Sequence, residues 1–295
     1  VTGVQTCALP IFLEDNELLA SLKAFFYFDG KPLILFFENP KDAKTLHKAI
    51  WNLNESPIAI IVSGETVDIY NGFSIDKNKH LLKRLGGFEE LTNFTYLELV
   101  TGKSWEKYQK DLAYTNRVDH HLLENIKSAQ SILCSDFGLE RELANALIGK
   151  VIFVRYLIDR HIRVNCKDKE VYLSNNDFCE LLRNKTELWR FFKTLQSSDK
   201  GFNGDMFKLT EEEFSKIPQE ALRVIIRLLR GDDIATGQKS LFQLYDFSIL
   251  PIEFISNVYE RFIGVENQRK QSAYYTPTFL VDYIVEETVG GQEAS

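Results

Sequence analysis

The sequence lacks any uninterrupted apolar run approaching the ~18 residues that a membrane-spanning helix requires. It is also poor in cysteine: outside the first eleven residues only Cys134, Cys166 and Cys179 occur, far apart in the chain. Their spacing fits neither a disulfide framework nor a zinc site, and it suits reduced thiols. These absences predict a cytoplasmic protein without a membrane partner or a metal site built from cysteine.

Several catalytic motifs are absent from the printed sequence as well. None of the seven prolines adjoins another, and no Gly-x-Gly occurs. A Gly-x-x-x-x-Gly-Lys phosphate loop, a His-Glu-x-x-His zinc motif and a Gly-x-Ser-x-Gly nucleophile turn are all missing. The sequence therefore gives no support to phosphate-loop nucleotide hydrolysis, zinc proteolysis or serine hydrolysis.

What the chain does contain is material for a core. Hydrophobic residues make up 44% of the 295 residues, with 22 phenylalanines, which argues against disorder and leaves room for about two domains. The formal net charge is -7. Because contact with phosphates demands local positive charge, strong DNA binding by this chain as a whole is not expected.

The N-terminal part changes its pattern every few residues, which favours an α/β domain. Phe25–Phe28 and Leu33–Phe37 are apolar runs around Asp29-Gly30, a strong hairpin signal. A helix is predicted over Lys41–Asn52, followed by strands at Ile58–Val62 and Val67–Tyr70. The predicted inward residues of the helix are Ala43, Leu46, Ile50 and Trp51, and the second pair of strands is expected to close at Asn71-Gly72.

Beyond Tyr114 the period becomes helical. One predicted stripe contains Leu122, Ile126, Ala129 and Leu133, and a second contains Leu143, Leu147, Val151, Val154 and Ile158. The second segment is apolar nearly all round, so a buried central helix is expected. Arg155 and Asp159, four positions apart, should form an ordinary structural pair within it, and His120-His121, at the start of the first helix, should face solvent rather than a metal. Phe178, Leu181, Leu182, Leu188, Phe191 and Phe192 continue the helical trend.

A helix predicted over Pro218–Arg230 carries one possible basic stripe. Arg223, Arg227 and Arg230 stand opposite the apolar positions and could touch DNA phosphates. Acidic residues precede this helix in the sequence at Glu211–Glu213 and follow it at Asp232-Asp233. A solvated helix face is therefore favoured over a nucleic-acid contact.

The C-terminal residues are the most informative part of the sequence. A helical pattern over Ser248–Gly264 is followed by a polar loop and then by Ala273-Tyr274-Tyr275-Thr276-Pro277. Thr276 can cap a helix N-terminus and Pro277 suits the first helical position. The helix that follows places Leu280, Val281, Ile284 and Val285 on one face. Backbone donors at such a helix start can hold the carboxylate of an amino-acid-like cofactor.

This order of elements resembles the large type IIG and related restriction–modification methylases. The resemblance is specific in residues 251–277 and continuous, though weaker, back to about Phe25. It implies an adenine-specific, N6-directed DNA methyltransferase of a restriction–modification or related phage-defence system, acting on double-stranded DNA. It further implies that Tyr275, Thr276 and Pro277 line a pocket for S-adenosylmethionine. The Asn/Asp-Pro-Pro-Tyr/Phe motif that binds the flipped adenine in that family is absent from this chain.

The N-terminal pattern is similar to the restriction-endonuclease-like core found at the front of many such enzymes. That core needs an aspartate near a Glu-x-Lys triplet to hold Mg²⁺ and assist the attacking water. Asp29, Glu38 and Lys41 are the candidates, but Lys41 comes one position late and Pro40 occupies the lysine position. A one-residue shift turns a strand side chain to the opposite face. A degenerate domain is therefore favoured over an active nuclease, and Mg²⁺ is expected only in the active case.

The expected organisation begins with residues 1–11, which look like a translated sequencing adapter. An α/β nuclease-like domain over 12–112, a helical connector over 113–247 and the start of a methyltransferase domain over 248–295 follow. The chain is thus interpreted as a fragment of a methyltransferase, inactive by itself. Two alternatives stay open: a metal-dependent endonuclease domain of a bifunctional restriction enzyme, or a non-catalytic α/β-plus-helical interaction scaffold. The oligomeric state does not follow from the sequence.

Overall fold

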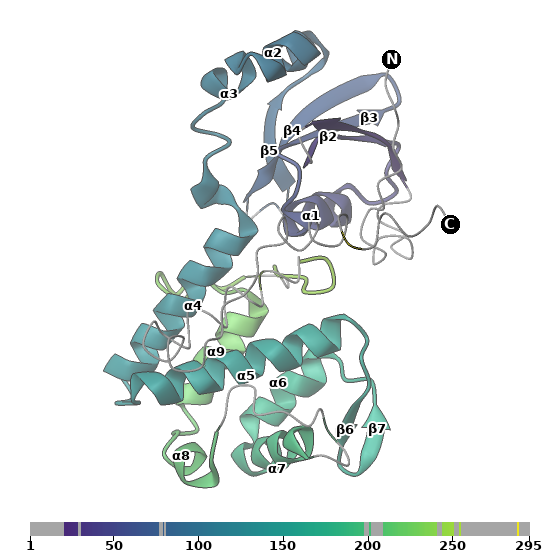
Figure 1. The fold of residues 1–295 in the computed structure, drawn as a ribbon. Helices are drawn as coiled ribbons and strands as arrows, with labels where there is room; N and C mark the ends of the chain where they lie inside the picture. The colour runs from purple at the N-terminus through teal and green to yellow at the C-terminus, as the bar shows by residue number, and fades with distance from the viewer. Residues whose placement is uncertain are drawn as a thin grey trace. The chain divides into compact units, whose positions relative to one another are not determined.

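The computed structural model describes residues 21–28, 31–76, 79, 81–197, 201, 209–240, 244–250, 254 and 288 (Figure 1). Contacts divide the chain into one compact unit over Val1–Pro251 and a second over Ile252–Ser295. Both the predicted α/β part and the helical part belong to the first unit. Residues 1–11, Asp29 and the whole Tyr274–Pro277 element lie outside the described residues. The predicted domain boundaries at 112 and 247 stay predictions.

The N-terminal half is built on a five-stranded mixed sheet whose spatial order follows the chain. The strands are β1 (Leu22–Phe28), β2 (Lys31–Glu38), β3 (Ile58–Ser63), β4 (Thr66–Asp76) and β5 (Leu81–Gly86). β2 and β3 are parallel, and the other neighbours are antiparallel. A parallel pair requires a crossover connection, and α1 (Ala43–Leu53) provides it. The predicted α/β class and the hairpin between β1 and β2 are thus confirmed.

α1 begins where the sequence offers a cap. The Asp42 carboxylate accepts hydrogen bonds from the backbone N–H groups of Lys44 and Thr45, which have no partner within the helix. Leu46, Ile50 and Trp51 are buried as predicted, whereas Ala43 is exposed and Ala49 is buried instead. The prediction for Ala43 was wrong because the buried face of α1 begins only at Leu46, after the first turn of the helix.

β4 is longer than the sequence suggested. Asn71-Gly72 was expected to be a turn, yet the strand continues through both residues to Asp76. Asn71 is fully buried, and its side-chain amide donates to the Asp111 carbonyl while its Oδ1 accepts from Phe73 N at 2.9 Å. Gly72 N donates to the Pro57 carbonyl at 2.8 Å, so the glycine permits a close backbone approach rather than a reversal. β5, which pairs with β4, was not predicted.

Apolar side chains cover both faces of the sheet. One face packs under the short helices η3 (Phe88–Phe94), α2 (Tyr96–Val100) and α3 (Lys103–Lys107). α1 packs against β4 and β5. Leu35, Phe37, Ala59 and Ile61 are buried and alternate along their strands with the residues of the first face. The core of that first face consists of Ile34, Ile58, Ile60, Ile69, Phe94, Leu99 and Tyr108.

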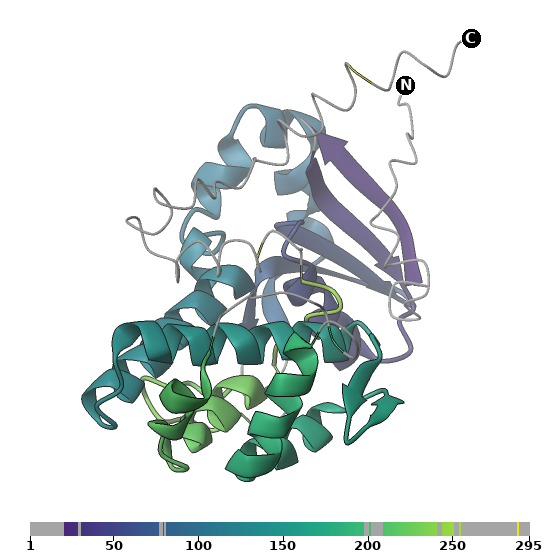
Figure 2. The same ribbon diagram turned by 60° about the horizontal axis from the view of Figure 1, so that its bottom comes forward.

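The helical region confirms the predicted apolar stripes. It contains α4 (Val118–Ser135), α5 (Arg141–Asp159), α6 (Asn175–Arg183), α7 (Lys185–Gln196), α8 (Glu211–Ser215) and α9 (Ala221–Arg230). α9 contacts α4, α5 and α6, and the teal and green helices lie side by side in Figure 2. All residues predicted to lie in the stripes of α4 and α5 are buried. A short hairpin, β6 (Val164–Cys166) and β7 (Lys169–Val171), was not predicted.

Within the part of the chain that the structure describes, none of the helices has both the length and the apolar character needed to cross a bilayer.

Candidate functional site

The predicted nuclease residues lie at the end of β2, where local chemistry stops the strand. Glu38 is its last residue, Asn39 has a positive φ of 45°, and Pro40 has no backbone donor for a sheet. Asn39 N donates to the Val62 carbonyl at 2.8 Å, and Gly64 N donates to the Asn39 side chain at 3.0 Å. This end of β2 is therefore fixed against the turn between β3 and β4.

The lysine that the structure brings to Glu38 is Lys23. Its Nζ lies 3.8 Å from Oε2 of Glu38, with side-chain exposures of 58% and 52%. Lys41 is exposed, beyond Pro40. The sequence contained a signal for Lys23, because a hairpin around Asp29-Gly30 places it diagonally across from Glu38 on the neighbouring strand.

The described residues do not assemble a site that fits Mg²⁺. No group of three or more histidine, cysteine, aspartate or glutamate side chains with metal-ligand geometry occurs among them. Glu38 contributes one exposed carboxylate, and Asp29 lies outside the described residues. The nuclease roles of Asp29, Glu38 and Lys41 stay predictions, and no chemical step through a metal follows from this geometry.

A buried aromatic and polar cluster joins α1, α4 and the segment 244–250. Tyr245 is 1% exposed, and its hydroxyl accepts from Asn125 Nδ2 at 3.0 Å and bonds His121 Nδ1 at 2.7 Å. The indole ring of Trp51 stacks on Tyr245 with ring centroids 6.3 Å apart, and it lies 6.0 Å from the His121 ring. His121 therefore contacts this cluster, and the prediction that it simply faces solvent was wrong.

The electrostatics of that cluster indicate a structural role. Burial raises the pKa of the Tyr245 phenol above its usual range, which keeps the hydroxyl protonated at neutral pH. Its hydrogen bonds reach across elements far apart in the sequence, as does the bond from Asn125 Nδ2 to the Asp232 carbonyl at 2.8 Å. The Tyr245 phenol therefore connects the helices through its hydrogen bonds. Because it does not ionise near neutral pH, it is a poor donor or acceptor for catalytic proton transfer.

Arg155 and Asp159 pair as predicted, but inside the protein. Nε of Arg155 donates to Oδ1 of Asp159 at 2.8 Å, and the side chains are 1% and 6% exposed. Arg155 also donates to the Leu229 carbonyl at 3.0 Å and to the Tyr245 carbonyl at 3.3 Å. Asp159 accepts from Phe247 N at 3.0 Å. The predicted structural pair is thus confirmed, and it is buried because α9 and the segment 244–250 cover this face of α5.

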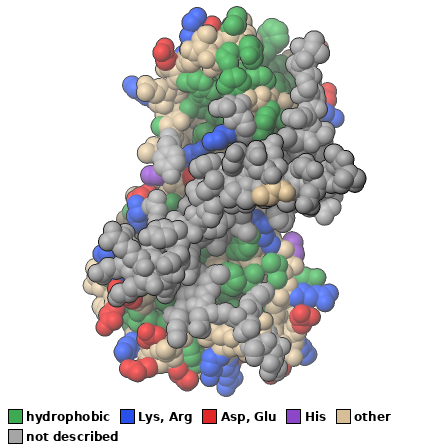
Figure 3. Space-filling model, viewed as in Figure 1, with side chains coloured by type: hydrophobic (Ala, Val, Ile, Leu, Met, Phe, Trp, Pro, Cys, Tyr) green, Lys and Arg blue, Asp and Glu red, His purple; other side chains and the backbone are tan. Residues whose placement is uncertain are grey.

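The arginines predicted as a DNA-contacting stripe lie on α9 without forming a uniform basic surface. Arg223 and Arg230 are exposed, whereas Nε of the half-buried Arg227 lies 3.7 Å from Oδ2 of Asp232. Figure 3 shows acidic and basic side chains intermixed over the helical region. A contact between these arginines and nucleic acid stays a prediction.

The sheet region exposes apolar side chains on its outer helices. Phe88, Tyr96 and Leu97 are 72%, 60% and 68% exposed, and hydrophobic side chains gather over the end of the molecule that carries α2 in Figure 3. Tyr96 also makes an edge contact with Phe26 of β1, with ring centroids 6.2 Å apart. These residues form an apolar surface of unassigned role.

Comparison with known proteins adds no relative. No family model matches the sequence, and searches of curated proteins and of solved structures returned no match.

Proposed function

We propose that this chain is part of a site-specific DNA adenine-N6 methyltransferase of a restriction–modification or related phage-defence system, with S-adenosylmethionine as methyl donor. The observation that carries the proposal is the sequence Ala273-Tyr274-Tyr275-Thr276-Pro277, preceded by a helical pattern and a polar loop. The mixed sheet and the helical region that precede it are compatible with a protein of that class.

Under this proposal Tyr275, Thr276 and Pro277 line the cofactor pocket. The Thr276 hydroxyl and the free backbone donors at the helix start bind the carboxylate of the methionine moiety. Pro277 fixes the backbone of the first turn without removing a donor that the helix needs. Double-stranded DNA is the macromolecular substrate, and the flipped adenine receives the methyl group.

The first test measures methylation in cells. The full-length protein is expressed in a host without its own adenine methylation, and single-molecule sequencing of the host DNA reads modified adenines. We expect N6-methyladenine at every copy of one short sequence. A soluble full-length protein that leaves all adenines unmodified would overturn the proposal.

A second test addresses the cofactor residues. Isothermal titration of the full-length protein with S-adenosylmethionine compares Thr276→Ala with Thr276→Ser, which keeps the hydroxyl. Loss of one hydrogen bond to a charged group costs about 1.5–3 kcal/mol, so we expect Thr276→Ala to weaken binding by roughly tenfold or more. Equal affinity of the two variants would show that Thr276 does not hold the cofactor.

A further inference from the structure

An open groove of about 610 Å³ lies between the β6–β7 hairpin and α7. The apolar side chains of Leu181 and Phe191, both buried, line its inner part. Lys167 comes from the hairpin turn, and Arg190 and Lys193 come from α7. The groove thus brings together three cationic side chains from two elements that are separate in the sequence.

Two cationic side chains of the groove are paired with a single carboxylate, that of Glu187. Nζ of Lys167 lies 3.5 Å from Oε2 of Glu187, and Nη1 of Arg190 lies 3.0 Å from its Oε1. Two cations therefore share one carboxylate, which is 26% exposed, while the lysine and arginine side chains are 70% and 71% exposed. Exposed pairs of this kind are weak, so a stronger anion can displace the carboxylate.

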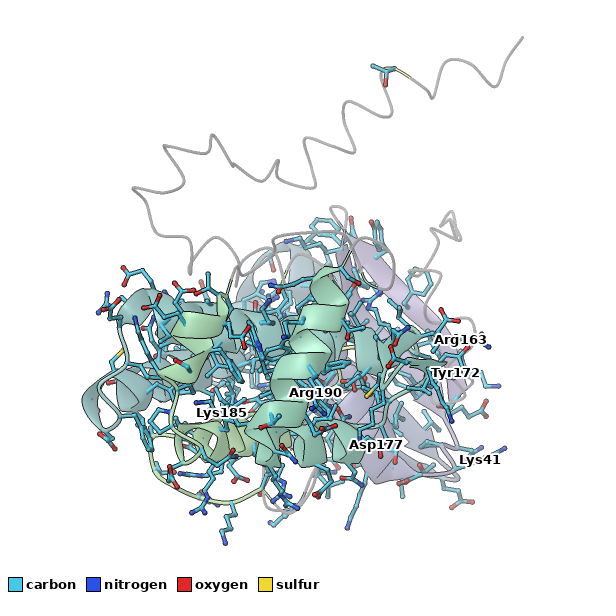
Figure 4. The ribbon with its side chains drawn as sticks, turned by 90° about the horizontal axis from the view of Figure 1, so that it is seen from below. Lys41, Arg163, Tyr172, Asp177, Lys185 and Arg190 are labelled. Carbon is cyan, nitrogen blue, oxygen red and sulfur yellow. The ribbon has the colours of Figure 1, made fainter. Side chains whose placement is uncertain are left out.

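Lys193 lies one turn of α7 beyond Arg190. Its Nζ is 3.8 Å from Oε2 of Glu211 and 5.7 Å from the centroid of the Trp189 ring. Both contacts are long and exposed to solvent. The ammonium group of Lys193 can therefore leave them and bind an anion that comes closer. Figure 4 shows Arg190 on α7, with Arg163 beside Tyr172 near the hairpin.

Lys167 lies in a strained backbone conformation, which indicates a functional role for its side chain. Lys167 and Asp168 have φ values of 53° and 61°, so two consecutive residues other than glycine adopt the left-handed conformation. A two-residue hairpin turn of this type favours Asn-Gly or Gly-Gly, which adopt it without strain. Strained residues of this kind concentrate at binding sites. The turn projects a cation into the groove at a cost in stability.

We propose that this groove binds the phosphodiester backbone of duplex DNA through Lys167, Arg190 and Lys193. The identification of the ligand as DNA rests on the proposed function. An open groove with cations from two elements suits an extended polyanion, and an arginine can bind a phosphate with two parallel hydrogen bonds. Because Glu187 and Asp168 lie beside these cations, binding is weak and strongly dependent on salt.

The test is fluorescence anisotropy of a labelled duplex titrated with the full chain at several salt concentrations. Lys167→Gly should weaken binding while the melting temperature stays equal or rises, because glycine relieves the strained turn. Arg190→Gln with Lys193→Gln should lower the slope of log K against log salt by about 0.9 for each phosphate that the protein no longer neutralises. Lys127→Gln is the matched control, since that exposed lysine of α4 pairs with Glu124 and neither residue lines the groove.

Removal of the shared carboxylate should act in the opposite direction. Glu187→Gln frees Lys167 and Arg190 from their common partner, so we expect tighter binding of the duplex. The same variants are titrated with inorganic pyrophosphate to distinguish DNA from a small anion. Binding of pyrophosphate alone, with duplex affinity unaffected by the groove variants, would overturn the proposal.

The outcome can be separated from that of the proposed function. Unchanged affinity and salt slope in all groove variants, together with adenine methylation in cells, would reject the groove and leave the methyltransferase in place. Loss of duplex binding in the groove variants, in a protein that methylates nothing, would support the groove and reject the methyltransferase.

Discussion

At the scale of single residues, the protein interior contains polar groups that the sequence pattern did not single out. His47 on α1 is 2% exposed, and its Nδ1 accepts from the backbone N–H of Leu82 at 2.9 Å. Its ring meets Tyr70 edge-on with centroids 4.4 Å apart. The imidazole therefore ties β5 to α1, and its hydrogen bond requires an unprotonated Nδ1.

This arrangement predicts a loss of stability in mild acid. Burial lowers the pKa of His47 from 6.5 to about 4, despite the nearby Asp68. A histidine with a depressed folded-state pKa stabilises the fold above its unfolded-state pKa, and the contribution is lost as pH falls from 6.5 towards 4. We expect His47 to account for about 1–2 kcal/mol of lost unfolding free energy between pH 7.5 and pH 5.

Urea denaturation at the two pH values measures the effect. His47→Asn keeps an acceptor near the Nδ1 position without titrating, so its stability should depend less on pH. The exposed His161, with a φ of 52° that asparagine tolerates, gives the control His161→Asn. Equal pH dependence in the wild type and His47→Asn would contradict the prediction.

At the scale of elements, β3 and β4 are held by a close backbone approach. A Cβ at Gly72 would lie 2.1 Å from the Ser56 carbonyl oxygen, which belongs to the backbone and cannot rotate away. Ser56 is itself buried, and its hydroxyl donates to the Ile58 carbonyl at 3.0 Å. The segment that leads into β3 thus depends on glycine at this position.

Gly72→Ala should therefore destabilise the protein. Forcing a methyl group against fixed backbone costs about 1–3 kcal/mol, and the bond from Gly72 N to Pro57 O would be strained as well. Thermal unfolding monitored by circular dichroism measures the change. Gly87→Ala is the control, because the closest atom to its Cβ would be the end of the flexible Arg84 side chain at 3.0 Å, and the nearest backbone atom, the Val67 carbonyl oxygen, would lie at an ordinary contact distance of 3.5 Å. Similar melting temperatures for both variants would reject this account of Gly72.

At the scale of the whole molecule, the segment 244–250 connects the sheet region with the helices. Asn52 at the end of α1 donates to the Leu244 carbonyl at 3.2 Å and accepts from Asp246 N at 2.8 Å. Arg160 donates to the Phe247 and Leu250 carbonyls at 3.3 and 3.2 Å. Arg155 contacts the same segment, so a short stretch without helix or strand is fixed from several elements.

The buried Arg155 predicts a large effect of a single substitution. Arg155→Met leaves Asp159 buried without its cation, which costs about 3–5 kcal/mol. Arg155→Met with Asp159→Asn removes the isolated charge and should be milder. Arg183→Met on the surface, where the arginine pairs with Glu180, should cost less than about 1 kcal/mol. Urea denaturation compares them, and an Arg155→Met variant as stable as Arg183→Met would contradict the buried network.

The sequence by itself determined the secondary structure of most described elements. Apolar spacing identified α4, α5 and α9, and it gave a helical trend without bounds over the residues of α6 and α7, because a helix packed on one side must repeat its buried residues every three to four positions. Asp29-Gly30 and the flanking apolar runs likewise indicated the hairpin of β1 and β2. These signals are local, so a single sequence contains them.

The tertiary structure decided which polar residues meet. Only the fold shows that Asn71-Gly72 lies inside β4, that Arg155 is buried, and that Lys167 and Arg190 line the same groove. Each of these contacts involves residues distant in the chain. The spacing of apolar residues along one helix or strand does not show which other element packs against it. The physical reason is that burial and pairing are set by long-range packing, whereas helix and strand periods are set by local geometry.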